Sequence, residues 1–283
     1  MSDAGRASDA DNWKPPAGDG AFLASLQFLG GIYLLLIVAM LAADIGYAAS
    51  EWRDVLSSLW TPEIRFSVWL SLISCTITAI LAMFVAVPIG YLMSRYDLPG
   101  KAWIDAVLDI PIFLPPLVIG LSLLILFRQT PLRVLDDNFP IALHVPAVIL
   151  AQFAVASAFA VRALRGTFDE ISPRQEQVAL TLGCSRWQAF WLVVLPAAWR
   201  GLVTAFTLAW ARAFGEFGPI LVFAGSTRLR TEVLPVSVHL ELSVGNIEGA
   251  VGVSLLMVLV ALAVLGVVRL IGSHGASYRG FEK

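Results

Sequence analysis

The stretch SPRQEQVALTLGCSRWQAFWLVVLP at residues 172–196 begins with the signals of a short, capped helix. Ser172 is suited to the N-cap, Pro173 to the first helical position, and Gln175 to a side-chain contact back to the cap. Gly183 follows where a helix C-terminus requires a left-handed residue, which glycine adopts without strain. The first half of the stretch therefore predicts a helix that ends at this glycine.

A second capped helix is predicted directly after the first. Ser185 and Gln188 repeat the capping-box spacing, and Pro196 then interrupts the helical pattern. Two short helices with polar caps, placed side by side in an otherwise apolar chain, indicate an element that meets water and serves as a docking surface. Residues 168–196 are called the capped loop below.

Composition places the rest of the chain in a membrane. The chain has 283 residues, of which 58% are hydrophobic and 14% charged. Soluble domains carry about 25% charged residues. The net charge of −2 is spread without a basic or acidic tail, so nothing indicates nucleic-acid binding.

Six apolar segments are long enough to cross a bilayer, since a hydrocarbon core of about 30 Å needs about 20 helical residues. The predicted spans lie at about residues 22–44, 65–93, 104–127, 141–164, 198–224 and 247–271. Strand-length alternating segments are absent, so we predict an all-α integral membrane protein. The expected domains are a disordered cytoplasmic leader at residues 1–20, one transmembrane domain at residues 21–272 that includes the capped loop, and a cytoplasmic tail at residues 273–283.

The distribution of basic residues predicts the orientation. With both termini in the cytoplasm, twelve of the 19 lysines and arginines fall in inner segments and six in outer segments. Arg212 remains, within the fifth span. The capped loop is therefore expected in the cytoplasm, between the fourth and fifth spans.

Motifs for covalent chemistry are missing from the sequence. It has no Gly-rich phosphate loop with a lysine, no H-E-x-x-H and no G-x-S-x-G. Cys75 and Cys184 are far apart and are interpreted as structural thiols. We expect no catalytic residue, no metal site and no cofactor bound by this chain.

Arg212 and Glu216 are the exception to the apolar character of the fifth span. They are four residues apart on a helix, so they share a face, and each unpaired charge would cost about 2.5–3.5 kcal/mol in the membrane. Mutual pairing toward the protein interior is expected. The pair either lines a path or gate, or joins helices as a structural ion pair. Gly215 and Gly218 allow the helix to bend there.

The capped loop resembles the EAA loop of the membrane subunits of ATP-binding-cassette (ABC) importers. The matching run is QVALTLG at residues 177–183, followed by LP at residues 195–196. Gln177 stands where the family has its glutamate, and Glu176 comes one position early.

Further motifs, in the same order as in the family, resemble the molybdate, tungstate and sulfate branch. They are LPPLVIG at residues 114–120, ARAFGEFG at 211–218, VFAG at 222–225 and TEVLP at 231–235. Phe217 is closer to the molybdate/tungstate form of the motif than to the sulfate form. The resemblance implies a type I ABC importer permease with cytoplasmic coupling helices.

In that family the coupling helices press into a groove on a separate ATPase. The residues expected to serve this contact are Glu176, Gln177, Val178, Ala179, Leu182, Gly183, Trp187 and Pro196. Independently of the resemblance, Val178, Ala179 and Leu182 have the spacing of an apolar ridge that fits a groove. The alternative is a membrane-surface helix that merely connects two spans.

Two further sets of residues are expected along the transport route. The path or gate is assigned to Arg212, Gly215, Glu216, Gly218, Pro115 and Pro116. The two prolines either kink the third span beside the path or serve only as passive packing kinks. Arg228 and Arg230 lie beyond the outer end of the fifth span, where they would attract a doubly charged oxyanion or contact a binding protein, or simply be solvated.

The sequence therefore predicts the transmembrane subunit of an ATP-driven importer in the bacterial inner membrane. The cargo expected first is molybdate or tungstate, and the alternative is sulfate or thiosulfate. Expected partners are two ATPase subunits that hold ATP and magnesium, a second permease subunit, a periplasmic oxyanion-binding protein and membrane lipid. The second permease subunit is expected to be another copy of this chain, and a related but distinct subunit is the alternative. A secondary transporter or channel with an Arg212–Glu216 relay is the alternative from another class.

Overall fold

A computed structural model describes residues 20–274, and within this range every regular element is helical. The predicted all-α class is confirmed. Residues 1–19 of the expected leader and residues 275–283 of the expected tail lie outside the described residues. The chain divides into two units, residues 1–50 and residues 51–283, which are described separately.

The first unit contains a single described helix, α1, at Gly20–Ser50. Leu34, Leu35 and Leu36 are consecutive, and each is more than half exposed. Because consecutive residues of a helix point about 100° apart, the helix has no polar side. A helix that is apolar all round suits a bilayer rather than water.

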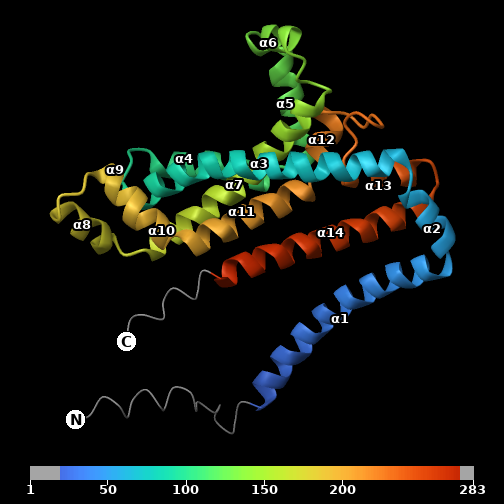
Figure 1. Ribbon diagram of the computed structural model, residues 1–283, viewed down its shortest axis with the longest axis horizontal. Coiled ribbons are helices and arrows are strands. Elements are labelled where there is room, and N and C mark those ends of the chain that lie inside the picture. Colours follow the sequence, from blue (N-terminus) through green and yellow to red (C-terminus); the bar gives the residue numbers. More distant parts are fainter. Residues whose placement is uncertain (1–19, 275–283) are drawn as a thin grey trace. The chain divides into compact units, whose positions relative to one another are not determined.

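The second unit is built from long helices joined by short ones (Figure 1). Its elements are α2 Trp52–Leu59, α3 Pro62–Arg95, α4 Lys101–Phe113, α5 Pro116–Arg128, α6 Leu132–Asn138, α7 Val145–Glu170, α8 Pro173–Thr181, α9 Arg186–Ala189, η1 Phe190–Val194, α10 Leu195–Ala197, α11 Trp199–Phe214, α12 Gly218–Phe223, α13 Leu234–Ser243 and α14 Ile247–His274.

Small residues form the centre of the second unit, where α3, α7 and α11 pack together (Figure 1). The buried alanines of these helices recur at spacings of three or four residues, which keeps them on one face. They are Ala79, Ala82 and Ala86 of α3, Ala156 and Ala160 of α7, and Ala205, Ala209 and Ala213 of α11. Without large side chains between them, the helix backbones approach closely, as is typical of helix packing in membranes.

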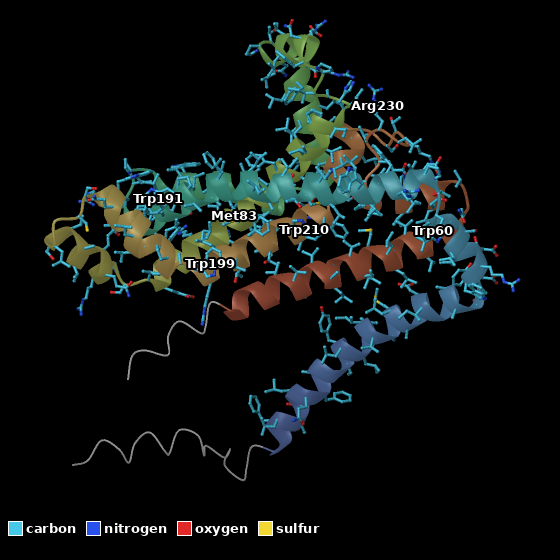
Figure 2. All side chains as sticks on the ribbon, in the orientation of Figure 1. Trp60, Met83, Trp191, Trp199, Trp210 and Arg230 are labelled. Atoms are coloured by element: carbon cyan, nitrogen blue, oxygen red, sulfur yellow. The ribbon has the colours of Figure 1, made fainter. Side chains whose placement is uncertain are left out.

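Polar side chains join the same helices inside the bundle. Thr78 of α3 donates a hydrogen bond to Gln152 Oε1 of α7 at 3.1 Å, and Gln152 Nε2 donates to Cys75 Sγ at 3.4 Å. Trp210 of α11, labelled in Figure 2, donates to Thr76 Oγ1 at 3.3 Å. These bonds satisfy polar groups that would otherwise be unpaired in an apolar interior.

The helices agree with six spans only if bent helices are counted. Four described helices are long and apolar enough to cross a membrane alone, and two bent pairs bring the number to six. The third predicted span is divided into α4 and α5, which meet at 110°. Leu114 is held in extended conformation before Pro115, and Pro115 precedes a second proline, so the helix cannot continue.

The fifth predicted span also differs from the prediction. Residues 186–197 and α11 form the second bent pair, with an angle of 72° between them, so this span begins before residue 198. α11 ends at Phe214, and α12 follows as a separate short helix. Likewise α7 begins at Val145 and continues to Glu170, later at both ends than the predicted 141–164.

Candidate docking face and intramembrane ion pair

The turn around Gly183 is held by two backbone hydrogen bonds. Gly183 has a φ of +91°, the left-handed conformation expected there. The N–H of Cys184 donates to the carbonyl of Ala179 at 3.1 Å, and the N–H of Gly183 donates to that of Leu180 at 3.1 Å. This pattern is a Schellman motif, which satisfies carbonyls that the end of α8 leaves free.

The two N-terminal caps differ. Ser185 and Gln188 form the expected capping box, with Gln188 N–H donating to Ser185 Oγ at 3.2 Å and Ser185 N–H to Gln188 Oε1 at 2.8 Å. At the first cap, Ser172 Oγ accepts from Arg174 N–H at 3.4 Å. Gln175 does not reach back with its side chain as expected; its N–H donates to the Ser172 carbonyl at 3.2 Å.

α8 and α9 lie together at one end of the second unit (Figure 1). Apolar side chains of the capped loop remain exposed there. Val178 is 56% exposed, Leu182 80% and Trp187 70%. Gln177 and Gly183 are exposed beside them. We call these five residues the docking face. Pro196 is also exposed, but it belongs to α10.

Two residues expected on the docking face point into the chain instead. Glu176 is 7% exposed and Ala179 is 6% exposed. The predicted ridge of Val178, Ala179 and Leu182 is therefore wrong in its middle member. The physical reason is that α8 lies against the bundle, and residues at positions i and i+3 of a helix share the face that is covered.

Arg212 and Glu216 form the expected ion pair. The distance between Arg212 Nη1 and Glu216 Oε2 is 2.6 Å. Glu216 is 1% exposed, whereas 29% of the Arg212 side chain remains accessible. The guanidinium carbon also lies 5.4 Å from the centre of the Phe159 ring, in cation–π contact. The carboxylate is thus neutralised within its own chain.

The break that follows α11 is held by close backbone contact with α5. A Cβ atom on Gly218 would lie 2.9 Å from Pro116 Cβ, and one on Gly120 would lie 2.7 Å from the Cα of Pro219. These distances require glycine on each side. Pro116 and Gly218, both assigned to the path, therefore meet directly, and Pro115 precedes them at the start of α5.

Arg228 and Arg230 have partners in the structure. Arg228 Nη2 donates to Glu241 Oε1 at 2.9 Å, and Asn246 Nδ2 donates to Glu241 Oε2 at 2.7 Å. Arg230, exposed and labelled in Figure 2, lies with Nη2 2.6 Å from His144 Nε2. These partners were not predicted from the sequence, since they lie on other elements and follow no local pattern.

The segment before α13 is buried although it is polar. Thr231 and Glu232 are 0% exposed, and the N–H of Leu234 donates to Ser71 Oγ of α3 at 2.8 Å. Ser237 Oγ donates to Glu232 Oε1 at 2.9 Å. Burial raises the pKa of Glu232 above its ordinary value, and the Ser237 hydrogen bond opposes this shift.

A charged cavity between α4 and α7 was also not predicted from the sequence. It has a volume of about 300 Å³, and it contains ion pairs of Arg162 with Asp109 and of Arg165 with Asp105. Arg165 Nε lies a further 3.9 Å from Asp169 Oδ2. The i, i+4 spacing of Asp105 and Asp109 on α4 was a signal that these carboxylates share one face.

A bundle of apolar helices with charges paired at a helix break has the features of a membrane transport protein. The chain belongs to the family of binding-protein-dependent transport system inner membrane components, which it matches over residues 86–274. The resemblance of the sequence motifs to those of importer permeases is confirmed by this match.

The names of similar proteins in this family give different transported ions. The chain is 33% identical over 196 residues to the molybdate/tungstate transport system permease protein WtpB of Thermococcus kodakarensis, covering 69% of this chain and 75% of that protein. It is 33% identical over 244 residues to the molybdenum transport system permease protein ModB of Mycobacterium tuberculosis, covering 85% and 92%. To the sulfate transport system permease protein CysW of Synechocystis sp. it is 29% identical over 238 residues, covering 82% and 86%.

Solved structures share the fold at low sequence identity. A chain of the bacterial ABC transporter involved in the import of the acidic polysaccharide alginate aligns with a TM-score of 0.71 at 14% identity, over 93% of this chain and 97% of that one. A chain of the MetNI methionine ABC transporter aligns with a TM-score of 0.60 at 18% identity, over 74% and 94%. The predicted permease architecture is confirmed by this likeness.

Proposed function

We propose that this chain is the transmembrane subunit of an ATP-driven importer that carries molybdate or tungstate across the bacterial inner membrane. The cargo is inferred from the names of the relatives, because molybdenum and tungstate permeases reach 33% identity, compared with 29% for the sulfate permease. Sulfate or thiosulfate is the alternative cargo.

The observation that carries the ATP-driven mechanism is the docking face. Val178, Leu182 and Trp187 expose apolar surface on both sides of a turn that is fixed by a Schellman motif and a capping box. A rigid helix end with exposed apolar anchors fits a groove on a protein partner. That partner is a separate ATPase, which binds ATP and magnesium and supplies the force for rocking of the permease subunits.

The remaining partners follow from the same mechanism. Two copies of this chain form the walls of the path, each contacts one ATPase subunit, and a periplasmic binding protein delivers the oxyanion. Both termini lie in the cytoplasm on the count of basic residues. Arg212 and Glu216 do not act as a proton relay in this proposal, since they already neutralise each other at 2.6 Å.

Uptake by proteoliposomes tests both parts of the proposal. The purified chain is reconstituted with its ATPase and binding protein, and accumulation of labelled molybdate, tungstate and sulfate is measured with and without ATP. We expect accumulation that requires ATP, is abolished without the ATPase, and is competed by tungstate more strongly than by sulfate. Accumulation driven by a proton gradient without the ATPase would contradict the mechanism, and preference for sulfate would contradict the cargo.

A further inference from the structure

Glu176 attaches α8 to the inner end of α3. The Tyr91 hydroxyl donates a hydrogen bond to Glu176 Oε1 at 2.6 Å, and Arg95 Nε lies 3.6 Å from Glu176 Oε2. The side chains of Arg95 and Glu176 are 9% and 10% exposed. Both carboxylate oxygens are therefore directed at α3. Tyr91, Arg95 and Glu176 are called the Glu176 anchor below.

The same arginine also holds the start of the capped loop. Arg95 Nη2 donates to the carbonyl of Ile171 at 2.8 Å, and Ile171 is the C-cap residue that follows α7. One guanidinium thus joins the end of α7, the first turn of α8 and the last turn of α3. Charge-assisted hydrogen bonds of this kind are stronger than neutral ones and fix relative geometry.

Aromatic side chains of the capped loop also pack against Tyr91 of the anchor. The Tyr91 ring meets Phe168 of α7 and Phe190 of η1 edge to face, at centroid distances of 5.8 Å and 4.8 Å. Figure 2 labels Trp191, which follows Phe190 in η1. Tyr91 therefore contacts both sides of the capped loop, and its hydroxyl reaches α8.

α3 is suited to receive movement from the docking face. It has 34 residues, so it is about 50 Å long at 1.5 Å per residue. It packs along α7 and α11 through the buried alanines. α3 therefore extends from its contact with α8 to the centre of the bundle.

We propose that the Glu176 anchor is the connection through which movement of the docking face reaches α3. Glu176 is a positioning residue that faces its own chain and does not contact the ATPase. The proposal rests on the proposed function, because it requires an ATPase to move the docking face. It assigns separate tasks to neighbouring residues of α8: Leu182 binds the partner, and Glu176 passes the movement on.

The test compares binding with coupling in the full reconstituted importer. Tyr91→Phe removes one hydroxyl and keeps the ring, Glu176→Gln removes the charge, and Glu170→Gln removes an exposed carboxylate at the end of α7 as the matched control. Three quantities are measured for each: ATPase retained by the chain, ATP hydrolysed, and molybdate transported per ATP.

For Tyr91→Phe and Glu176→Gln we expect retained ATPase and continued hydrolysis, with transport per ATP reduced about tenfold. In the double variant, transport per ATP is expected to be no lower than in the more impaired single variant, because both changes remove the same connection. Glu170→Gln should match the wild type.

Two results would overturn the proposal. Unchanged transport per ATP in both anchor variants would show that aromatic packing alone passes the movement. Loss of the ATPase from Glu176→Gln, while Tyr91→Phe retains it, would place Glu176 in the contact with the partner. A wild-type chain that retains no ATPase is a separate outcome, which contradicts the proposed function itself and the anchor with it.

Discussion

The capped loop and the break between α11 and α12 are both interruptions of helices, but they are built in opposite ways. The capped loop is fixed by hydrogen bonds between residues close in sequence, and it exposes apolar side chains such as Leu182. The break is fixed by contact with a distant helix, with Gly218 against Pro116, and it buries the charge of Glu216. The first presents apolar surface that a partner subunit can cover. The second is suited to keep its geometry inside the membrane.

This difference predicts where substitutions cost stability and where they cost only binding. Changes at the break should lower the free energy of unfolding, because they act on buried groups. Changes to the exposed side chains of the docking face should leave that free energy nearly unchanged.

Breaking the buried ion pair should have the largest effect. Arg212→Met leaves the Glu216 carboxylate buried without its cation, so we expect the free energy of unfolding in detergent to fall by about 3–5 kcal/mol. Adding Glu216→Gln should recover most of the loss, because the uncompensated charge is removed. Chemical unfolding of the single and double variants measures both. A single variant as stable as the wild type would show that leaving the Glu216 carboxylate without its cation costs no stability.

Adding one methyl group at the contact of α5 with α12 should have the next largest effect. Gly120→Ala places a Cβ 2.7 Å from the Cα of Pro219, so we expect a loss of about 1–3 kcal/mol. Gly166→Ala in α7 is the matched control, since nothing lies within 4 Å of the added atom. The midpoint of thermal unfolding is measured for both variants. Equal midpoints would mean that the close contact of α5 with α12 does not contribute to stability.

Backbone strain at the turn of the capped loop should have a smaller effect on stability. Gly183→Val forces a β-branched residue to a φ of +91°, which costs about 1–2 kcal/mol, although nothing lies within 4 Å of the new atom. Membrane insertion should be normal, while uptake is separated from ATP hydrolysis. Gly183→Asn is the control, since asparagine tolerates this conformation. Normal uptake by the valine variant would count against docking through this turn.

These regions also differ in how far the sequence predicted them. The Schellman turn at Gly183 and the capping box at Ser185 were predictable because their partners lie within a few residues. The i, i+4 pair of Arg212 and Glu216 was predictable for the same reason. The inward direction of Glu176 was not, since Tyr91 and Arg95 lie in another helix.

The same limit explains the other differences. Arg228 is neutralised by Glu241 of α13, and Arg230 contacts His144, neither of which a local pattern identifies. Prolines at positions 115 and 116 predicted an interruption, but they predicted neither the 110° angle between α4 and α5 nor the close contact of α5 with α12. Local chemistry predicted the elements, and long-range packing decided their directions.

The docking face itself should show the smallest effect on stability and the most direct effect on function. Leu182→Ser and Trp187→Ser change exposed side chains, so the free energy of unfolding should stay within about 0.5 kcal/mol of the wild type. Truncation of central apolar anchors typically costs binding about 2 kcal/mol or more, so the ATPase should bind at least about tenfold more weakly.

Binding through the docking face is tested most sharply by the affinity of the ATPase for the Leu182→Ser/Trp187→Ser double variant, measured in detergent alongside the wild-type chain. We expect a folded variant of unchanged stability that has lost the ATPase and, with it, ATP-dependent uptake. Wild-type affinity in that variant would contradict the claim that the exposed apolar residues of the capped loop bind the ATPase.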